Sequence, residues 1–157
     1  PCWVVRAETE NERDQVTTRK WDCADPNQLS TQARCWPDAA YLRLAETYLL
    51  AAEAEFRQGK LAEAAEHINA LRRRVHASEI TPDQVTLDFI LDERSRELYS
   101  EEHRRYTLVR TGTLVDRVRE HNLLAGPNIE EHNVLLPFPQ AAIDANLTAE
   151  LPQNPGY

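Results

Sequence analysis

The chain has 157 residues, of which 41% are hydrophobic, and its formal net charge is −8 at pH 7. A chain of this length can bury one sizeable core, so we expect a single domain over residues 1–157, and no run of about 20 apolar residues is present that would cross a bilayer. The acidic balance argues against nucleic-acid partners, because binding to phosphates requires a basic face.

The first segment, residues 1–40, contains all three cysteines of the chain, which are Cys2, Cys23 and Cys35. Turn-forming residues are frequent in it, and we expect a mostly irregular segment with at most one short strand near residues 15–21. A disulfide between Cys23 and Cys35 would suit an exported protein, whereas free thiols would suit a reducing compartment. The sequence is compatible with both states, and the odd number of cysteines would leave one free thiol beside a disulfide.

Trp3, Trp21 and Trp36 also lie in this first segment. An exposed indole ring is a flat apolar platform on which the C–H face of a sugar can stack, so these three residues are our candidate ligand contacts. The competing interpretation is structural, because an irregular segment with few aliphatic residues needs large side chains to anchor it to neighbouring helices.

An antiparallel helix pair is predicted over residues 41–76, with helices at residues 41–56 and 60–75. Gly59 stands between them, at a position that is typical of a helix C-terminal cap. Small residues, Ala52 and Ala64, would let the two helices approach closely, as they do in one tetratricopeptide unit.

A long third helix is predicted within residues 82–121, ending before Gly112. Two start signals precede it: Thr81 opens a capping box with proline at the first helical position, and Thr86 stands just before the apolar positions begin. One apolar stripe follows the helical period: Leu87, Ile90, Leu91, Leu98, Leu108 and Val109.

Charged residues, Arg94, Glu101 and Arg105, fall inside the arc of that stripe. One interpretation is catalytic, with Glu97 and Glu101 as a general-acid and general-base pair, but neighbours on one helix are poorly placed to flank a substrate. A di-iron site would need a Glu three residues before a His, and none of the five histidines has one. We therefore favour a structural network of paired charges, made of Arg94, Glu97, Glu101 and Arg105, that fixes how the helices dock.

The C-terminal part is predicted to be a shorter helix over residues 113–121 and an extended tail over residues 122–157. Proline is frequent in residues 133–139, which argues against a central strand there. Asn146-Leu147-Thr148 matches the N-glycosylation acceptor pattern, which is short enough to occur by chance.

Several segments, taken in order, resemble one protein family. Residues 41–54 read YLRLAETYLLAAEA, residues 92–98 read DERSREL and are followed by Glu101, Arg104 and the run LVRTG at residues 108–112. The end of the chain contains LLPFPQ, IDAN and a final QNPGY. Each piece is weak alone, but their combination and order resemble the SusD/RagB family, the surface glycan-binding lipoproteins of Bacteroidetes-type bacteria.

This resemblance implies an all-α fold in which tetratricopeptide-like helix pairs support a more irregular ligand-binding region. It also implies a non-enzymatic protein without a cofactor or metal that binds glycans, or sometimes peptides, at the outer-membrane cell surface. Such proteins hold to the membrane through an N-terminal lipid and deliver their ligand to a TonB-dependent SusC-like transporter. The alternative is a helical-repeat protein-interaction module without sugar binding.

The chain departs from the family pattern in two respects. Tyr106 stands where members often have Trp, and Thr107 replaces an Asp. The chain also corresponds only to the C-terminal portion of the family, and it contains no methionine, so we expect the lipid anchor and preceding helical repeats to belong to a longer product. Family ligand sites are built by variable loops, so the resemblance assigns no binding residue.

Overall fold

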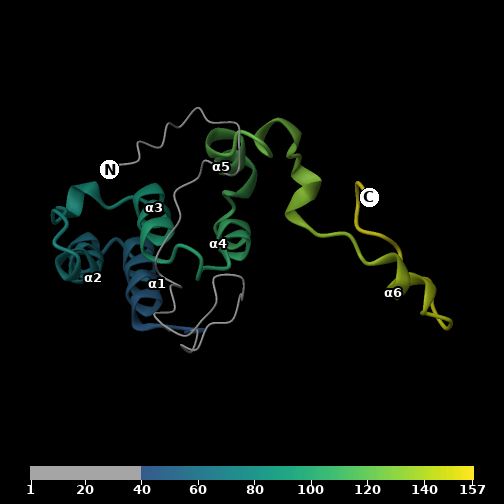
Figure 1. The fold of residues 1–157 in the computed structure, drawn as a ribbon, viewed down its shortest axis with the longest axis horizontal. Coiled ribbons are helices and arrows are strands. Elements are labelled where there is room, and N and C mark those ends of the chain that lie inside the picture. Colours follow the sequence, from purple (N-terminus) through teal and green to yellow (C-terminus); the bar gives the residue numbers. More distant parts are fainter. Residues whose placement is uncertain (1–39) are drawn as a thin grey trace, which may run out of the picture. The chain divides into compact units, whose positions relative to one another are not determined.

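Helices α1 (Leu44–Arg57) and α2 (Leu61–Arg74) form the antiparallel pair at the start of the fold (Figure 1). The computed structural model describes residues 40–157. Gly59 in the connection has φ +74°, a left-handed conformation that glycine adopts without steric penalty and that ends α1. The predicted helix pair and its stop at Gly59 are therefore confirmed, whereas the likeness to a tetratricopeptide unit stays a prediction.

The predicted long third helix is wrong in its continuity. The structure contains α3 (Leu87–Glu97) and α4 (Arg104–Thr111), separated by a turn in which Ser100 has φ +63°. In a continuous helix residues 94 and 102 would lie about 12 Å apart along the axis, since each residue rises about 1.5 Å. The turn instead brings the Glu102 carboxylate within 2.6 Å of Nε of Arg94, so a tertiary ion pair replaces one stretch of helical hydrogen bonds.

Both predicted start signals are used, but by different elements. Thr81 precedes η2 (Pro82–Gln84), a single turn of 3-10 helix, and its backbone N–H donates to the Gln84 side chain at 2.9 Å. Thr86 caps α3, because its hydroxyl oxygen accepts from the backbone N–H of Phe89 at 3.0 Å.

Helix α5 (Leu114–His121) confirms the predicted shorter helix, and Gly112, with φ +72°, ends α4 before it. The tail is extended only in part. It also contains two short 3-10 turns and one short helix, namely η3 (Gly126–Asn128), η4 (Glu131–Val134) and α6 (Gln140–Asp144). Every regular element of residues 40–157 is a helix, which confirms the all-α fold class.

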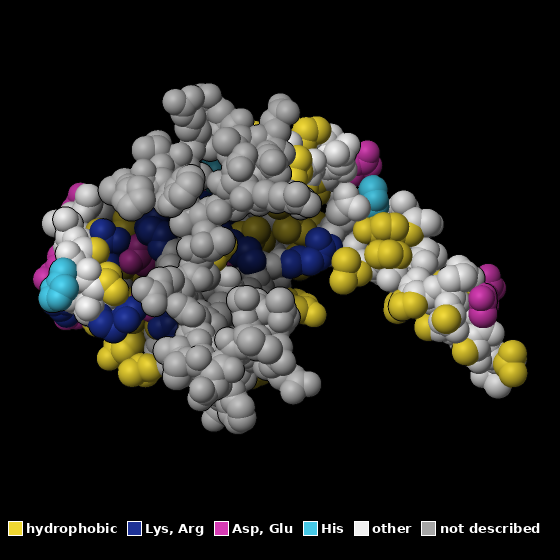
Figure 2. Space-filling model, viewed as in Figure 1, with side chains coloured by type: hydrophobic (Ala, Val, Ile, Leu, Met, Phe, Trp, Pro, Cys, Tyr) yellow, Lys and Arg dark blue, Asp and Glu magenta, His cyan; other side chains and the backbone are white. Residues whose placement is uncertain are grey.

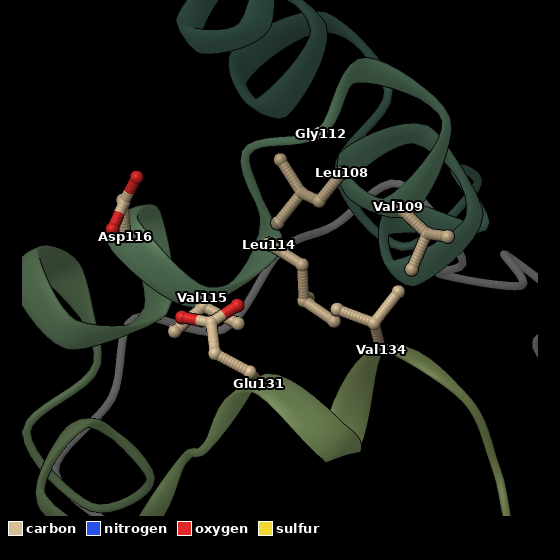
Figure 3. Close-up of a pocket in the computed structure, with 8 residues that line it drawn as sticks. All are labelled: Leu108, Val109, Gly112, Leu114, Val115, Asp116, Glu131 and Val134. Atoms are coloured by element: carbon tan, nitrogen blue, oxygen red, sulfur yellow. The ribbon is translucent and has the colours of Figure 1, made fainter.

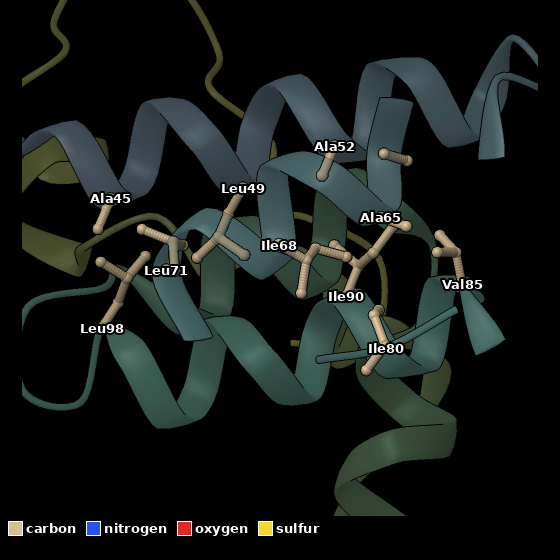
Figure 4. Packing of buried hydrophobic residues seen from close by; sticks show 11 residues of the cluster. Ala45, Leu49, Ala52, Ala65, Ile68, Leu71, Ile80, Val85, Ile90 and Leu98 are labelled. Carbon is tan, nitrogen blue, oxygen red and sulfur yellow. The ribbon is translucent and has the colours of Figure 1, made fainter. Parts of the chain in front are cut away.

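The largest hydrophobic core lies among α1, α2 and α3 (Figure 4). Its buried members are Ala45, Leu49, Ala52, Ala64, Ala65, Ile68, Leu71, Ile80, Val85, Ile90 and Leu98. Ala52 and Ala64 are both fully buried, so the small residues do lie where the paired helices meet. Asn69 fixes the connection that follows α2, because its amide exchanges two hydrogen bonds, of 2.8 and 2.9 Å, with the backbone of Ile80.

A second, smaller cluster joins α3 to α4 and α5 through Leu91, Leu108 and Leu114.

None of the helices described in residues 40–157 has the length and apolar character that crossing a membrane requires. The cysteines, the tryptophans and the short strand proposed near residues 15–21 lie outside the described residues. The single domain over residues 1–157 also stays a prediction.

Candidate functional site

Arg94 on α3 is the most deeply buried charged side chain of the predicted network, with 1% of its surface exposed. Its Nη2 donates to the Glu46 carboxylate on α1 at 3.1 Å, and its Nε donates to Glu102 at 2.6 Å. Its Nη1 is buried without a hydrogen-bond partner. Arg94 therefore ties α1, α3 and the turn before α4 to one another, with carboxylates that sequence spacing did not single out.

The other members of the predicted network lie in different surroundings. Glu97 accepts two hydrogen bonds from Nη2 of Arg74, at 2.8 and 2.9 Å, and so links α3 to the end of α2. Arg105 on α4 donates to the backbone carbonyl of Asn133. Glu101 lies in the turn between α3 and α4, so the helical spacing to Arg105 on which the predicted pair rested is not present.

Glu53 on α1 forms another buried charge cluster. Both of its carboxylate oxygens accept from Arg110 on α4, each at 2.6 Å, and Arg57 adds a bond of 3.0 Å. Hydrogen bonding to Arg110 holds the pKa of the Glu53 carboxyl below its ordinary value, although burial opposes this shift. Glu53 is thus ionised at neutral pH and fixes α4 against α1.

A polar cleft of about 480 Å³ opens between α3, α4 and α5. Its lining residues are Asp92, Ser95, Arg104, Leu108, Arg117, Val118, His121 and Asn122. Helical spacing brings them together, since each helix contributes side chains from successive turns of one face. The volume falls within the range of about 300 to 1,000 Å³ that is usual for small-molecule sites, so this polar cleft is the candidate ligand site of residues 40–157.

Arg117 and Leu108 form the buried part of the polar cleft, with 8% and 6% of their surfaces exposed. The Arg117 guanidinium donates to Asp88 at 2.7 Å and also to Asp92, both on α3. Its Nε is buried and has no hydrogen-bond partner. The charge of Arg117 is therefore compensated by two carboxylates, while one of its donors remains unused.

Arg104 also lines the polar cleft, and its charge is less well compensated by carboxylates than that of Arg117. Its Nη1 donates to the Leu91 carbonyl at 2.8 Å and lies 3.4 Å from Glu102, a carboxylate that Arg94 already holds more closely. Burial lowers the pKa of the Arg104 guanidinium, and the nearby Arg117 charge lowers it further, against the opposing effect of Glu102. Within residues 40–157 its Nε and Nη2 have no hydrogen-bond partner.

A second cavity, of about 80 Å³, lies between α4, α5 and η4 (Figure 3). Figure 3 shows the apolar side chains of Leu114 and Val134 pointing toward each other across it, with Leu108 and Val109 on the α4 side. This volume is well below the usual size of a ligand site, so we interpret the cavity as a gap in packing.

In the described part of the chain, no group of three or more His, Cys, Asp or Glu residues could hold a metal ion.

The family model of the SusD family matches residues 5–157, which is nearly the whole chain. The chain belongs to the SusD family. The resemblance of the sequence motifs to this family is thereby confirmed.

The chain is similar to two curated relatives and to one solved structure. SusD-like protein P25 of Formosa agariphila is 37% identical over 113 residues, which is 66% of this chain and 21% of that protein. Starch-binding protein SusD of Bacteroides thetaiotaomicron is 35% identical over 150 residues, 92% of this chain and 26% of that protein. A laminarin-binding SusD-like protein matches with a TM-score of 0.55 and 39% identity over 74% of this chain and 22% of that one. The chain thus spans about a fifth to a quarter of the length of these proteins.

Sequence reasoning missed the polar cleft, although two of its residues, Asp92 and Arg104, stand in the motif that resembles the SusD family. No local pattern shows that the face of α3 carrying Asp92 meets Arg117 and His121 of α5. The spacing of Arg117 and His121, one helical turn apart, was the one available signal for a shared polar face. The predicted contacts Trp3, Trp21 and Trp36 lie outside the described residues and remain a proposal.

Proposed function

We propose that this chain is part of a SusD-family protein that binds oligosaccharide or polysaccharide at the outer-membrane surface and delivers it to a TonB-dependent SusC-like transporter. The single observation that carries the proposal is the alignment with the starch-binding protein SusD over 92% of this chain. The laminarin-binding SusD-like structure supports the same class of ligand. Attachment to the membrane would come from an N-terminal lipid on the longer product.

The proposed binding involves no covalent chemistry. The helices α1 to α4 form a scaffold that is held together by the ion pairs of Arg94 and Glu53. Sugar would be held by hydrogen bonds and by stacking on aromatic rings, for which Trp3, Trp21 and Trp36 remain the candidates. Glu97 is a poor candidate for a catalytic acid because Arg74 holds its carboxylate in an ion pair.

Affinity electrophoresis in gels containing starch or laminarin tests the binding step. We expect the protein to be retarded by at least one of these polysaccharides and the retardation to be reduced when Trp3, Trp21 and Trp36 are replaced by Ala. Tyr106→Ala is the matched control, since Tyr106 is an exposed aromatic residue on α4 and should leave retardation unchanged. Migration that is indifferent to every polysaccharide tried would favour the alternative, a helical-repeat protein-interaction module.

Two further measurements test the rest of the proposal. Reducing-end assays should detect no hydrolysis of the bound polysaccharide, and turnover that disappears in Glu97→Gln or Glu101→Gln would contradict the non-enzymatic assignment. Detergent extraction of the outer membrane should recover the full-length protein together with a SusC-like transporter, and failure to co-purify would contradict the delivery step.

A further inference from the structure

The polar cleft between α3, α4 and α5 offers unused hydrogen-bonding groups of both kinds. Arg104 presents Nε and Nη2 as donors within the described structure, and Arg117 has one buried donor without a partner. Asp92 gives one carboxylate oxygen to Arg117, and its other oxygen has no partner among residues 40–157. Asn122 uses its amide oxygen to accept from the backbone N–H groups of Leu124 and Ala125, which leaves its amide N–H groups as donors.

The charge balance of this cleft argues against a simple anion site. Arg117 already faces Asp88 and Asp92, and Arg104 lies near Glu102, so an incoming anion would meet three carboxylates. A purely apolar ligand is equally unsuitable, because it would leave the donors of Arg104 and the acceptor of Asp92 desolvated and unpaired. A neutral ligand with hydroxyl groups satisfies both limits, because each hydroxyl can donate and accept at once.

The apolar part of the cleft limits the ligand further. Leu108 is buried at the base, and Val118 lies half-buried beside it on α5. The rim residues Ser95, His121 and Asn122 are exposed, so the cleft is open to solvent on one side and closed on the other. A sugar ring fits this arrangement, because its C–H face can rest on the apolar base while the hydroxyls around its edge meet the polar side chains.

We propose that this cleft binds one neutral saccharide unit, with neighbouring hydroxyls between the Arg104 guanidinium and the Asp92 carboxylate and with a C–H face on Leu108 and Val118. The inference rests on the proposed glycan binding, because the same ligand class is involved. It assigns a second contact region in the α3 to α5 part of the chain, separate from the tryptophans of residues 1–40. A cleft of about 480 Å³ is large enough to hold a sugar ring.

Isothermal titration calorimetry of the purified full-length protein with maltotriose and laminaritriose tests this assignment. Arg104→Gln removes the charged donor, and Ser95→Leu fills the exposed rim with an apolar side chain that is favourable in a helix. We expect each to weaken binding of the better trisaccharide by about tenfold to a hundredfold, because hydrogen bonds to a charged group are lost or blocked. Arg119→Gln is the matched control, since Arg119 is an exposed arginine of α5 that does not line the cleft.

Side-chain NMR signals provide a readout that a folding defect would not imitate. The Nε–H resonances of Arg104 and Arg117 should shift when trisaccharide is added to the unaltered protein, and they should still shift in the variant that lacks Trp3, Trp21 and Trp36. Unchanged arginine resonances, with binding by Arg104→Gln and Ser95→Leu within twofold of the unaltered protein, would overturn the cleft and leave the proposed function standing. If neither trisaccharide nor any glycan binds, the proposed function and the cleft both fall.

Discussion

Helices α1 to α3 and the tail at residues 135–157 are stabilised in different ways. The helices share a core in which Leu49, Ile68 and Ile90 are fully buried, and charged side chains around that core are paired across helices. The tail contains no Lys or Arg, and it exposes most of its large apolar side chains, including Leu136 and Leu147. Figure 2 shows the same contrast, with basic side chains on the helical part and mainly apolar or uncharged groups toward α6.

In the tail, side chains of the final QNPGY stretch form hydrogen bonds with the backbone of residues 135–138. Gln153 accepts from the Phe138 backbone N–H at 2.7 Å and donates back to the Phe138 carbonyl at 3.0 Å. Asn154 donates to the Leu136 carbonyl at 2.7 Å, and the Tyr157 hydroxyl donates to the Leu135 carbonyl at 2.9 Å. Because Pro137 and Pro139 lack an N–H, a strand partner could not pair fully with residues 135–139, whereas side-chain amides can bond to the backbone groups that remain.

Because of this difference, the two regions should respond differently to mutation. Loss of a buried group in the helical part removes packing that many residues share, so the whole unit should lose stability. Loss of one hydrogen bond in the tail affects groups that are already near water, so the effect should be small and local.

Replacing Arg94 by Ala should have the largest effect. The change leaves the buried Glu102 carboxylate without its closest partner, and breaking a buried pair typically lowers the free energy of unfolding by about 3 to 5 kcal/mol. Denaturant unfolding followed by circular dichroism measures this loss. Arg119→Ala, an exposed arginine 3.7 Å from Glu131, should change stability by less than about 0.5 kcal/mol, and equal losses in the two variants would contradict the role assigned to Arg94.

A cavity in the core should be nearly as damaging. Leu49→Ala removes a fully buried side chain from α1 and should lower the free energy of unfolding by about 2 to 5 kcal/mol. Its neighbour Leu50 is 44% exposed, so Leu50→Ala should cost much less in the same denaturation experiment. Similar losses at the two positions would mean that the α1 to α3 core does not dominate stability.

Acid should weaken the link between α1 and α4 through Glu53. Because the folded pKa of Glu53 lies below its ordinary value of 4.5, its stabilising contribution is present above that value and is lost as pH falls through the folded pKa. Glu53→Gln should therefore reduce stability most at neutral pH, and the difference from the unaltered protein should shrink as pH falls below about 4.5. Denaturation at several pH values measures this difference, and a pH-independent gap would contradict the ion pair with Arg110.

Gln153→Ala should have the smallest effect. It removes the paired hydrogen bonds to Phe138, so amide hydrogen exchange should quicken in residues 135–157, consistent with a local loss of about 1 kcal/mol per bond. Global unfolding should change little. Gln140→Ala serves as a comparison in the same tail, because the Gln140 side chain donates to Asp144 within α6. A loss of global stability from Gln153→Ala would show that the tail and the helical part are not energetically separate.

Local chemistry in the sequence determined much of this fold. Apolar positions at helical spacing predicted α1, α2 and α5, and Gly59, Thr86 and Gly112 marked the ends of helices where the structure has them. These features depend on residues within a few positions of each other, so periodicity and capping rules identify them. The motif order also indicated the SusD family, which the family model confirms.

Only the tertiary structure decided the break between α3 and α4, the partners of Arg94 and the lining of the polar cleft. Residues 97–103 contain no Gly or Pro, so the residue types that usually mark a turn are missing there. Glu46 and Arg94 are 48 residues apart in the sequence, and Asp92 and Arg117 are 25 apart. Helical spacing rules relate residues within a few positions of each other, so they could not predict these ion pairs. Burial makes the pairing of a charge mandatory, but the identity of its partner depends on which helices pack together.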